Sequence, residues 1–385
     1  MRVALFSGNY NYLREGANQA LNRLVDHLER RRGYRVRVYS PVTETPAFEP
    51  AGTLVPVPSV PLPIRNEFRL ALGLPGHVRD DIRSFRPDIV HVSTPDILNS
   101  RAQTLARRLD VPIVASQHTR FETYLAYYRL GWLSPLTDAH LRRFYRRSDR
   151  ILCPTAALAA DMRRVCGDRV SVWSRGVDHA LFNPARRDLA WRRGVGIADE
   201  EIAILFFGRL VLEKGVQVFI DTVKSLQAKG AKVRAIAVGA GPADTLFASL
   251  PGSILPGHLD GRDLARAIAS ADIMLNPSTT ETFGNVILEA MASGLAVVSA
   301  NAPNAHAIMV HGRTGLIPNR NRKQDYADAL LGLIERPAER ARIGQAAREA
   351  SLGFTWEAAC ENVVEAYQAA LATKPRRCAI NNSEM

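Results

Sequence analysis

The 385 residues are 46% hydrophobic and 23% charged, a globular composition that excludes a disordered chain and favours two domains over a single core. The four cysteines lack CxxC or zinc-type spacing, so they indicate neither a metal site nor a disulfide framework, and a reducing cytoplasm is the simplest expectation. A net charge of +12 points to an anionic partner, which is a phosphorylated ligand, a nucleic acid or an anionic membrane surface.

The N-terminus, MRVALFSGNYNYL, begins a strand and has no long apolar segment behind a basic start. The sequence contains no run of about 18 apolar residues. We therefore expect neither a signal peptide nor a membrane-spanning helix, and a cytoplasmic protein.

Residues 1–178 are predicted to form a doubly wound α/β domain. The strand VALFSG, a helix with one apolar face and the strand YRVRVYS make a βαβ unit, which implies a parallel sheet with right-handed crossovers. The proline-rich segment 41–63 is predicted to be an extended surface loop with short edge strands. Further strands are predicted at 88–93, 111–117 and 150–155.

The second half repeats this pattern after a linker, 179–200. The strand IAILFFG opens a second Rossmann-like domain, 201–354, and strands alternate with helices through LAVVSA. Two such sheets are expected to face each other across a cleft. An amphipathic helix, 355–373, is predicted to pack back toward the N-terminal domain, and 374–385 to be a disordered tail.

The segment FFGRLVLEKG places Arg209 and Lys214 in a loop between a strand and a helix that starts near Gly215. Cations beside a helix N-terminus suit a diphosphate. No GK[ST] follows, so this is not a Walker A motif, and solvated surface charges are the alternative. The following turn, VGAGPAD, is either a partial dinucleotide fingerprint or a site of tight packing between strand and helix.

The stretch ETFGNVILEA contains two glutamates, one before and one inside a helix that is predicted to start around Asn285. On one helix, eight residues would separate their Cα atoms by roughly 12 Å along the axis and by about 80° around it. Catalytic carboxylates of sugar-cleaving enzymes lie about 5 to 9.5 Å apart, so hydrolysis is disfavoured, although a folded-back loop could close the gap. The pair is interpreted as two separate contacts to one elongated ligand. Charges that favour the helix dipole are the alternative.

The backbone N–H groups at the start of this helix are free to bind an anionic phosphate. They belong to Phe283, Gly284 and Asn285. Glu281 would then lie on one side of the phosphate and Glu289 on the other, where each carboxylate suits vicinal sugar hydroxyls.

The segments GRLVLEKG, VGAGP, ETFGNVILEAMASGLAVV and HGRTGLIP resemble the retaining GT-B glycosyltransferases of family 4 over nearly the whole chain. The resemblance implies two doubly wound Rossmann-like domains, with the nucleotide sugar bound by the second and the acceptor mainly by the first. It implies that Arg209 and Lys214 contact the donor diphosphate. Glu281 would bind hydroxyls of the transferred sugar, and Glu289 would bind the ribose.

Two positions of the first domain also match the family. Gly16, in REGAN, corresponds to a glycine loop whose backbone approaches the donor phosphate, and His118, in SQHTRFETY, to a histidine near the transferred sugar. A single histidine after a strand is more often structural, but its place at a strand end and the resemblance favour a function.

The chain contains no D-x-D motif, so no divalent metal and no other cofactor is expected. Arg209, Lys214 and the helix end would instead stabilise the leaving nucleotide. No carboxylate is evidently placed to attack the anomeric carbon. The resemblance therefore implies substitution on one face with retained configuration, in which the departing phosphate takes the acceptor's proton.

An arginine-rich helix precedes residue 150, with an apolar edge that includes Trp132. This pattern suits docking on anionic lipid at the cytoplasmic face of the inner membrane. A solvated helix is the alternative, and nucleic-acid binding ranks lower because no nucleic-acid motif accompanies the charge. The predicted docking residues are Trp132, Arg142, Arg143, Arg146 and Arg147.

The segments TPDILNSRAQTLARRLDVPIVASQHTRFETY and VWSRGVDHALFNP resemble a subgroup of the family. It contains bacterial lipid mannosyltransferases, which use GDP-mannose, and plant-type sulfoquinovosyl diacylglycerol synthases, which use UDP-sulfoquinovose. The first implies α-mannose transfer from GDP-mannose to a membrane glycerolipid or glycolipid, and a UDP-hexose donor (glucose, glucuronate or sulfoquinovose) with a diacylglycerol acceptor is the alternative. Arg175 stands where many members have asparagine.

Two other classes share this architecture, the nucleotide-sugar 2-epimerases and non-catalytic sugar-binding proteins. The lipid-facing stretch and the spacing of the two glutamates favour a transferase over both. The oligomeric state is not indicated by the sequence.

Overall fold

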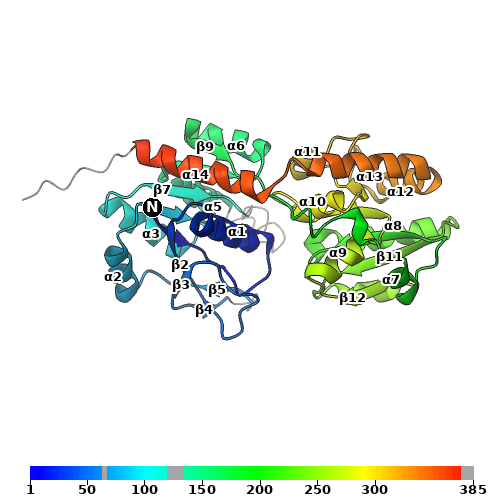
Figure 1. Cartoon of the computed structure of the whole chain (residues 1–385), viewed down its shortest axis with the longest axis horizontal. Helices are drawn as coiled ribbons and strands as arrows, with labels where there is room; N and C mark the ends of the chain where they lie inside the picture. Colours follow the sequence, from blue (N-terminus) through cyan, green and yellow to red (C-terminus); the bar gives the residue numbers. More distant parts are fainter. Residues whose placement is uncertain (63–66, 119–133, 374–385) are drawn as a thin grey trace, which may run out of the picture. The chain divides into compact units, whose positions relative to one another are not determined.

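The computed structural model describes residues 1–62, 67–118 and 134–373 and contains two compact units (Figure 1). The N-terminal unit consists of Met1–Ser174 together with the chain from Glu357, and the C-terminal unit consists of Arg175–Trp356. The predicted linker, 179–200, lies inside the C-terminal unit, where it forms η3 (Pro184–Arg186) and α7 (Leu189–Gly194). The predicted tail, 374–385, lies outside the described residues.

A parallel seven-stranded sheet forms the centre of the N-terminal unit, in the order β3-β2-β1-β6-β7-β8-β9. All residues of β6 and β7 are buried, as expected for parallel strands that are covered on both faces. The strands are β1 (Arg2–Phe6), β2 (Arg35–Ser40), β3 (Thr53–Pro56), β6 (Ile89–Val92), β7 (Ile113–Ser116), β8 (Arg150–Cys153) and β9 (Val170–Val172).

Four helices pack on one face of this sheet in a common hydrophobic core, and two others belong to the opposite face. The four are α2 (Gly76–Phe85), α3 (Ile97–Arg108), α5 (Ser134–Arg146) and α6 (Ala156–Cys166). The other two, α1 (Gly16–Arg30) and α14 (Trp356–Thr373), lie side by side, and His27 Nε2 is 2.7 Å from Glu361 Oε1 (Figure 1).

The proline-rich segment forms short edge elements, as predicted. β3 lies at the edge of the main sheet, and β4 (Val60–Pro61) pairs with β5 (Arg69–Leu70) in a separate antiparallel ribbon. Proline cannot donate to a strand ladder, which keeps these pieces short.

The C-terminal unit contains a five-stranded parallel sheet in the order β12-β11-β10-β13-β14. Its strands are β10 (Ile202–Phe207), β11 (Val233–Val238), β12 (Ile254–Gly257), β13 (Ile273–Asn276) and β14 (Ala296–Ser299). Its further helices are η4 (Leu212–Lys214), α8 (Val216–Ala228), η5 (Asp244–Ser249), α9 (Gly261–Ala269), α10 (Asn285–Ala292), α11 (Pro303–Ile308), α12 (Lys323–Glu335) and α13 (Pro337–Ser351).

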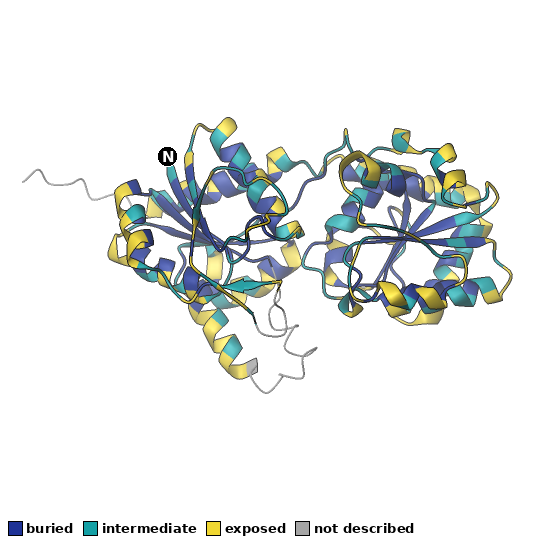
Figure 2. Cartoon of the chain, turned by 90° about the horizontal axis from the view of Figure 1, so that it is seen from below, coloured by how far each residue is buried: buried dark blue, intermediate teal, exposed yellow. Residues whose placement is uncertain are grey.

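Two hydrophobic cores cover the two faces of this sheet, one containing α8 and α12 and the other containing α9, α10 and α13. The burial pattern in Figure 2 shows the dark strands enclosed by helices with exposed outer faces in each unit. The predicted class, α/β with two Rossmann-like parallel sheets, is confirmed. Within the described ranges, no helix has the length and apolar character needed to cross a membrane.

Candidate active site

Two loops at the carboxyl ends of adjacent strands carry the main predicted site residues of the C-terminal unit. β10 pairs with β13, so the loop after β10 and the loop after β13 leave the sheet side by side. They are joined by an ion pair in which Lys214 Nζ donates to Glu281 Oε1 at 2.5 Å. The two side chains are 25% and 20% exposed, so the pair is accessible to a ligand but partly shielded from water.

The position of the first loop depends on glycines, because a side chain would collide with its neighbours. A Cβ on Gly215, whose φ is 76°, would lie 2.9 Å from Pro277 Cγ. A Cβ on Gly239 would lie 1.9 Å from the carbonyl oxygen of Gly208, and one on Gly241 would lie 2.3 Å from that of Leu210. Close packing is therefore sufficient to explain the glycine-rich turn VGAGPAD. The turn packs against the loop that carries Arg209, and not against a helix as the packing alternative expected.

Helix α10 starts at Asn285, as predicted. Gly284 precedes it with φ 95°, a left-handed conformation that favours glycine. Asn285 is half-buried, and Phe283 is 4% exposed and contributes its ring to the core, so only its backbone is available to a ligand. No side chain caps the first turn of α10, which leaves its amides as the natural position for an anion.

Glu289 lies one turn inside α10 and is half-buried. Burial raises the pKa of its carboxyl group to about 8. Among the described residues, this side chain has no hydrogen bond or ion pair that would stabilise its charge. A buried carboxyl group without a protein partner is typical of a ligand-binding position.

Sequence reasoning missed two buried polar side chains of the C-terminal unit, Asn304 and Ser278. Each is 1% exposed, and neither the amide atoms of Asn304 nor the hydroxyl of Ser278 has a hydrogen-bond partner in the described part of the chain. Asn304 Nδ2 would lie 3.0 Å from a Cβ on Gly284, which places it beside the start of α10. Unpaired buried polar atoms are destabilising, so the amide of Asn304 indicates a ligand oxygen or water at this end of the helix.

In the N-terminal unit, His118 and Gly16 follow β7 and β1 at the carboxyl edge of the sheet. His118 is 7% exposed, its Nε2 lies 2.8 Å from Ser116 Oγ, and its ring contacts the edge of Trp173 at a centroid distance of 5.2 Å. Gly16 is exposed and is the first residue of α1. The structure therefore places the predicted site residues in two groups, one in each unit.

The arginine-rich helix is α5. Arg142, Arg143 and Arg146 are exposed, whereas Arg147 is half-buried and donates to Thr104 Oγ1 at 2.9 Å. Desolvation, followed by repulsion from Arg107 and Arg143, lowers the pKa of Arg147. Arg107 of α3 therefore adds to the positive charge around α5. Trp132 lies outside the described residues.

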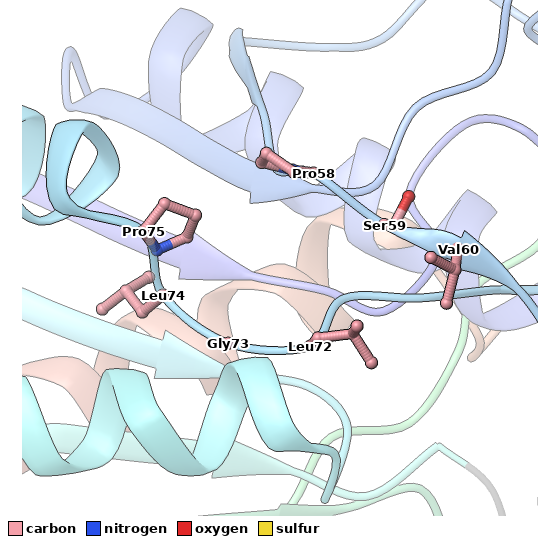
Figure 3. A pocket seen from close by; sticks show the side chains of 7 residues that line it. All are labelled: Pro58, Ser59, Val60, Leu72, Gly73, Leu74 and Pro75. Carbon is pink, nitrogen blue, oxygen red and sulfur yellow. The ribbon is translucent and has the colours of Figure 1, made fainter.

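Three further observations concern Arg175, metal binding and a surface depression. Arg175 is 3% exposed at the start of the C-terminal unit. The described ranges contain no group of three or more His, Cys, Asp and Glu side chains that could hold a metal ion. An open, largely apolar depression of about 480 Å³ in the N-terminal unit contains no predicted site residue (Figure 3) and is lined by Pro58, Ser59, Val60, Leu72, Gly73, Leu74 and Pro75.

Two parallel α/β sheets, one in each unit, are the architecture of the GT-B fold. The chain is similar in structure to sucrose-phosphate synthase from Thermosynechococcus elongatus, with a TM-score of 0.77 and 18% sequence identity over 97% of this chain and 99% of that one.

The model of Glycosyltransferase Family 4 matches residues 14–181, and that of Glycosyl transferases group 1 matches residues 201–336. A GDP-mannose-dependent alpha-mannosyltransferase of Mycolicibacterium smegmatis is 32% identical over 98% of this chain and 100% of its own length. The sulfoquinovosyl transferase SQD2 of Arabidopsis thaliana is 33% identical over 81% of this chain, a match that spans 63% of that protein. The chain belongs to glycosyltransferase family 4 and is a hexosyltransferase.

Proposed function

We propose that this enzyme transfers α-mannose from GDP-mannose to a membrane glycerolipid or glycolipid with retention of configuration. The observation that carries the proposal is the paired Lys214 and Glu281 beside the start of α10. The choice of donor and sugar is supported by the full-length similarity to the GDP-mannose-dependent alpha-mannosyltransferase.

The geometry suggests a division of roles in donor binding. Arg209, Lys214 and the first amides of α10 bind the diphosphate, because all are positive or partly positive groups. Lys214 is paired with Glu281 just before this helix, and Arg209 lies in the same loop as Lys214. Glu281 accepts hydrogen bonds from hydroxyls of the transferred sugar. Lys214 and Glu281 hold each other in place until the donor arrives, and the phosphate and sugar then take over parts of both side chains.

Glu289 binds the ribose, whose vicinal hydroxyls can donate to its carboxylate. Asn304 contributes to the phosphate site through the amide atoms that lack a protein partner. Gly16 and His118 belong to the N-terminal unit, to which we assign acceptor binding.

In the chemical step, the bond between the anomeric carbon and the phosphate oxygen breaks, and a bond to the acceptor hydroxyl oxygen forms on the same face of the sugar. The leaving phosphate oxygen takes the proton of that hydroxyl. Arg209, Lys214 and the α10 amides stabilise the charge that develops on the leaving group. No divalent metal enters this scheme, so loss of activity in EDTA that a divalent ion restores would contradict it.

The acceptor side of the proposal relies on α5. Its exposed arginines form a cationic surface that suits anionic lipid headgroups, which would place the enzyme on the cytoplasmic face of the inner membrane as a peripheral protein.

The experiment that tests the proposal supplies the purified protein with a total lipid extract and radiolabelled GDP-mannose, UDP-glucose or UDP-glucuronate. We expect label from GDP-mannose in the organic phase, in a product that α-mannosidase cleaves. Label from a UDP-sugar would instead favour the second candidate, UDP-hexose transfer to diacylglycerol, which the similarity to SQD2 supports. A free epimer, or no turnover, would contradict both.

A further inference from the structure

A buried chain of hydrogen bonds in the N-terminal unit connects Tyr367 to His118. Tyr367 Oη lies 2.6 Å from His91 Nδ1, and His91 Nε2 lies 2.8 Å from Ser116 Oγ. Ser116 Oγ in turn lies 2.8 Å from His118 Nε2. Tyr367 and His91 are fully buried, Ser116 is 1% exposed and His118 is 7% exposed, so water does not compete for these bonds. We call these four residues the Tyr367 relay.

The fold places the relay by strand register and by one helix. His91 of β6 is paired with Val114 of β7, and Ser116 lies two residues further along β7, on the same face of the sheet. Tyr367 comes from α14, on the face opposite the core that contains Val90 and Val92. The ring of Trp173 contacts both imidazoles edge-on, at centroid distances of 6.1 Å for His91 and 5.2 Å for His118, and this restricts their orientation.

His91 is neutral in this environment, because burial lowers the pKa of its imidazole to about 3. A neutral imidazole has one donor nitrogen and one acceptor nitrogen. His91 therefore donates one of its two hydrogen bonds and accepts the other. The direction of donation between Tyr367 and His91 thus determines the direction between His91 and Ser116.

Tyr367 determines the direction in which these hydrogen bonds are donated. Its hydroxyl makes no other hydrogen bond within residues 1–62, 67–118 and 134–373, and a buried O–H group that does not donate is strongly disfavoured. Tyr367 accordingly donates to His91 Nδ1, and His91 Nε2–H donates to Ser116. The buried hydroxyl of Ser116 has no other acceptor than His118 Nε2 among the described residues, so Ser116 donates to that nitrogen. The opposite direction would leave the phenol hydrogen without an acceptor.

We propose that the Tyr367 relay is a positioning device that holds His118 in the tautomer with its proton on Nδ1, which makes Nδ1 the donor atom of this imidazole. Tyr367, His91 and Ser116 act through His118 and are positioning residues. A further step rests on the proposed function: a fixed tautomer of His118 supports the transfer reaction.

Nitrogen-15 NMR of histidine-labelled protein tests the relay directly, because the two nitrogens of a neutral imidazole have distinct shifts when protonated and unprotonated. We expect His91 as the Nε2–H tautomer and His118 as the Nδ1–H tautomer, with signals assigned from H91Q and H118N. Tyr367→Phe, which removes one oxygen atom, should shift His118 toward a mixture of tautomers. Tyr326→Phe is the matched control, since it removes a buried phenol hydroxyl that bonds Asn321 in the other unit.

A wild-type His118 with its proton on Nε2, or His118 signals that Tyr367→Phe leaves unchanged, would overturn the relay. Ser116→Ala provides an independent check should the tyrosine variant unfold, because it removes the hydroxyl that joins the two imidazoles. His118 should shift toward a mixture of tautomers, while Tyr367 still holds His91 as the Nε2–H tautomer. Ser116→Thr, which keeps the hydroxyl, should restore the wild-type pattern.

Kinetics then test the link to catalysis. Tyr367→Phe should lower kcat about five- to tenfold and leave KM for the nucleotide sugar within about twofold, while Tyr326→Phe changes neither. Equal rates in wild type and Tyr367→Phe, despite the NMR change, would contradict a role of the relay in catalysis and leave the tautomer assignment intact. Absence of transfer from every donor in the wild type would contradict the proposed function, and the NMR result would still decide the relay.

Discussion

The two units place polar side chains at the same edge of similar parallel sheets, but in opposite electrostatic states. In the C-terminal unit, Lys214 and Glu281 are charged, paired and partly exposed. In the N-terminal unit, the groups behind His118 are fully buried, and His91 is neutral. This difference agrees with the proposed function, in which the C-terminal sheet edge binds the charged diphosphate of the donor and the N-terminal sheet edge orients neutral hydroxyl groups.

Replacing Lys214 tests the charged side of this comparison and should have the largest effect. Lys214→Ala removes a diphosphate cation and leaves Glu281 without its partner, so kcat/KM should fall about 10²- to 10³-fold in the transfer assay. Lys229→Ala removes an exposed lysine at the end of α8 and is the charge-matched control. A decrease of less than tenfold in the first variant would show that Lys214 does not bind the leaving group.

The two glutamates separate catalysis from nucleotide binding. Glu281→Gln should lower kcat with little change in the affinity for free GDP, whereas Glu289→Gln should weaken GDP binding about tenfold or more, because it removes hydrogen bonds to a charged acceptor. Calorimetric titration with GDP measures both. If the variants bound GDP equally well, the division of roles between sugar and ribose would be wrong.

Glu289 also predicts proton release when the nucleotide binds. Its pKa is raised to about 8 in the free enzyme, and ribose hydroxyls that donate to the carboxylate should lower it. GDP should therefore bind more tightly as the pH rises toward 8, with up to one proton released near pH 7. Calorimetry in buffers of different ionisation enthalpy measures this release, and Glu289→Gln should abolish it. Proton uptake would contradict the proposed contact.

The exposed arginines of α5 give the N-terminal unit a proposed lipid-docking surface, which is assigned to no helix of the C-terminal unit. Changing Arg142, Arg143, Arg146 and Arg147 to serine should reduce flotation with anionic liposomes at least about tenfold, since each arginine near a charged bilayer contributes about 1 kcal/mol. A control with the same loss of charge changes the exposed arginines Arg30, Arg31, Arg79 and Arg83. Equal flotation of both variants, or no preference for anionic vesicles in the wild type, would rule out specific docking through α5.

The smallest effect concerns stability. A carboxyl group whose pKa is higher in the folded protein than in the unfolded chain stabilises the fold at low pH, and this contribution is lost as the pH rises from about 4.5 to 8. Glu289→Gln should thus raise Tm by a few degrees at pH 8 and leave it nearly unchanged at pH 4.5. Thermal unfolding at the two pH values measures the difference, and an equal shift at both would contradict the raised pKa.

The periodicity of apolar residues predicts most of the fold, because buried parallel strands and one-faced helices leave strong local patterns. The start of α10 was also predictable from local sequence. Gly284, just before the helix, has a left-handed conformation that few residues other than glycine adopt. The contact between Lys214 and Glu281 is different. These residues are brought together by the pairing of β10 with β13, so only the resemblance to a family could suggest it from the sequence.

The residues that sequence reasoning missed are those whose importance depends on their surroundings. His91 lies in an ordinary strand, DIVHVS, and Asn304 in an ordinary helix start. Nothing in either segment indicates that one side chain would join a hydrogen-bond chain with Tyr367, 276 positions away, or that the other would be buried without a partner. Burial and pairing of this kind become visible only in three dimensions.

Because α14 belongs to the N-terminal unit, the order of synthesis and the order of folding differ in this protein. The C-terminal unit is a continuous segment that lies between the two parts of the other unit along the chain. The N-terminal unit lacks a helix with seven buried residues, among them Tyr367, until α14 has left the ribosome. The unit translated second can therefore complete its fold first. Until α14 packs beside α1, one face of the nascent N-terminal sheet is only partly covered, at a stage when exposed apolar surface favours aggregation.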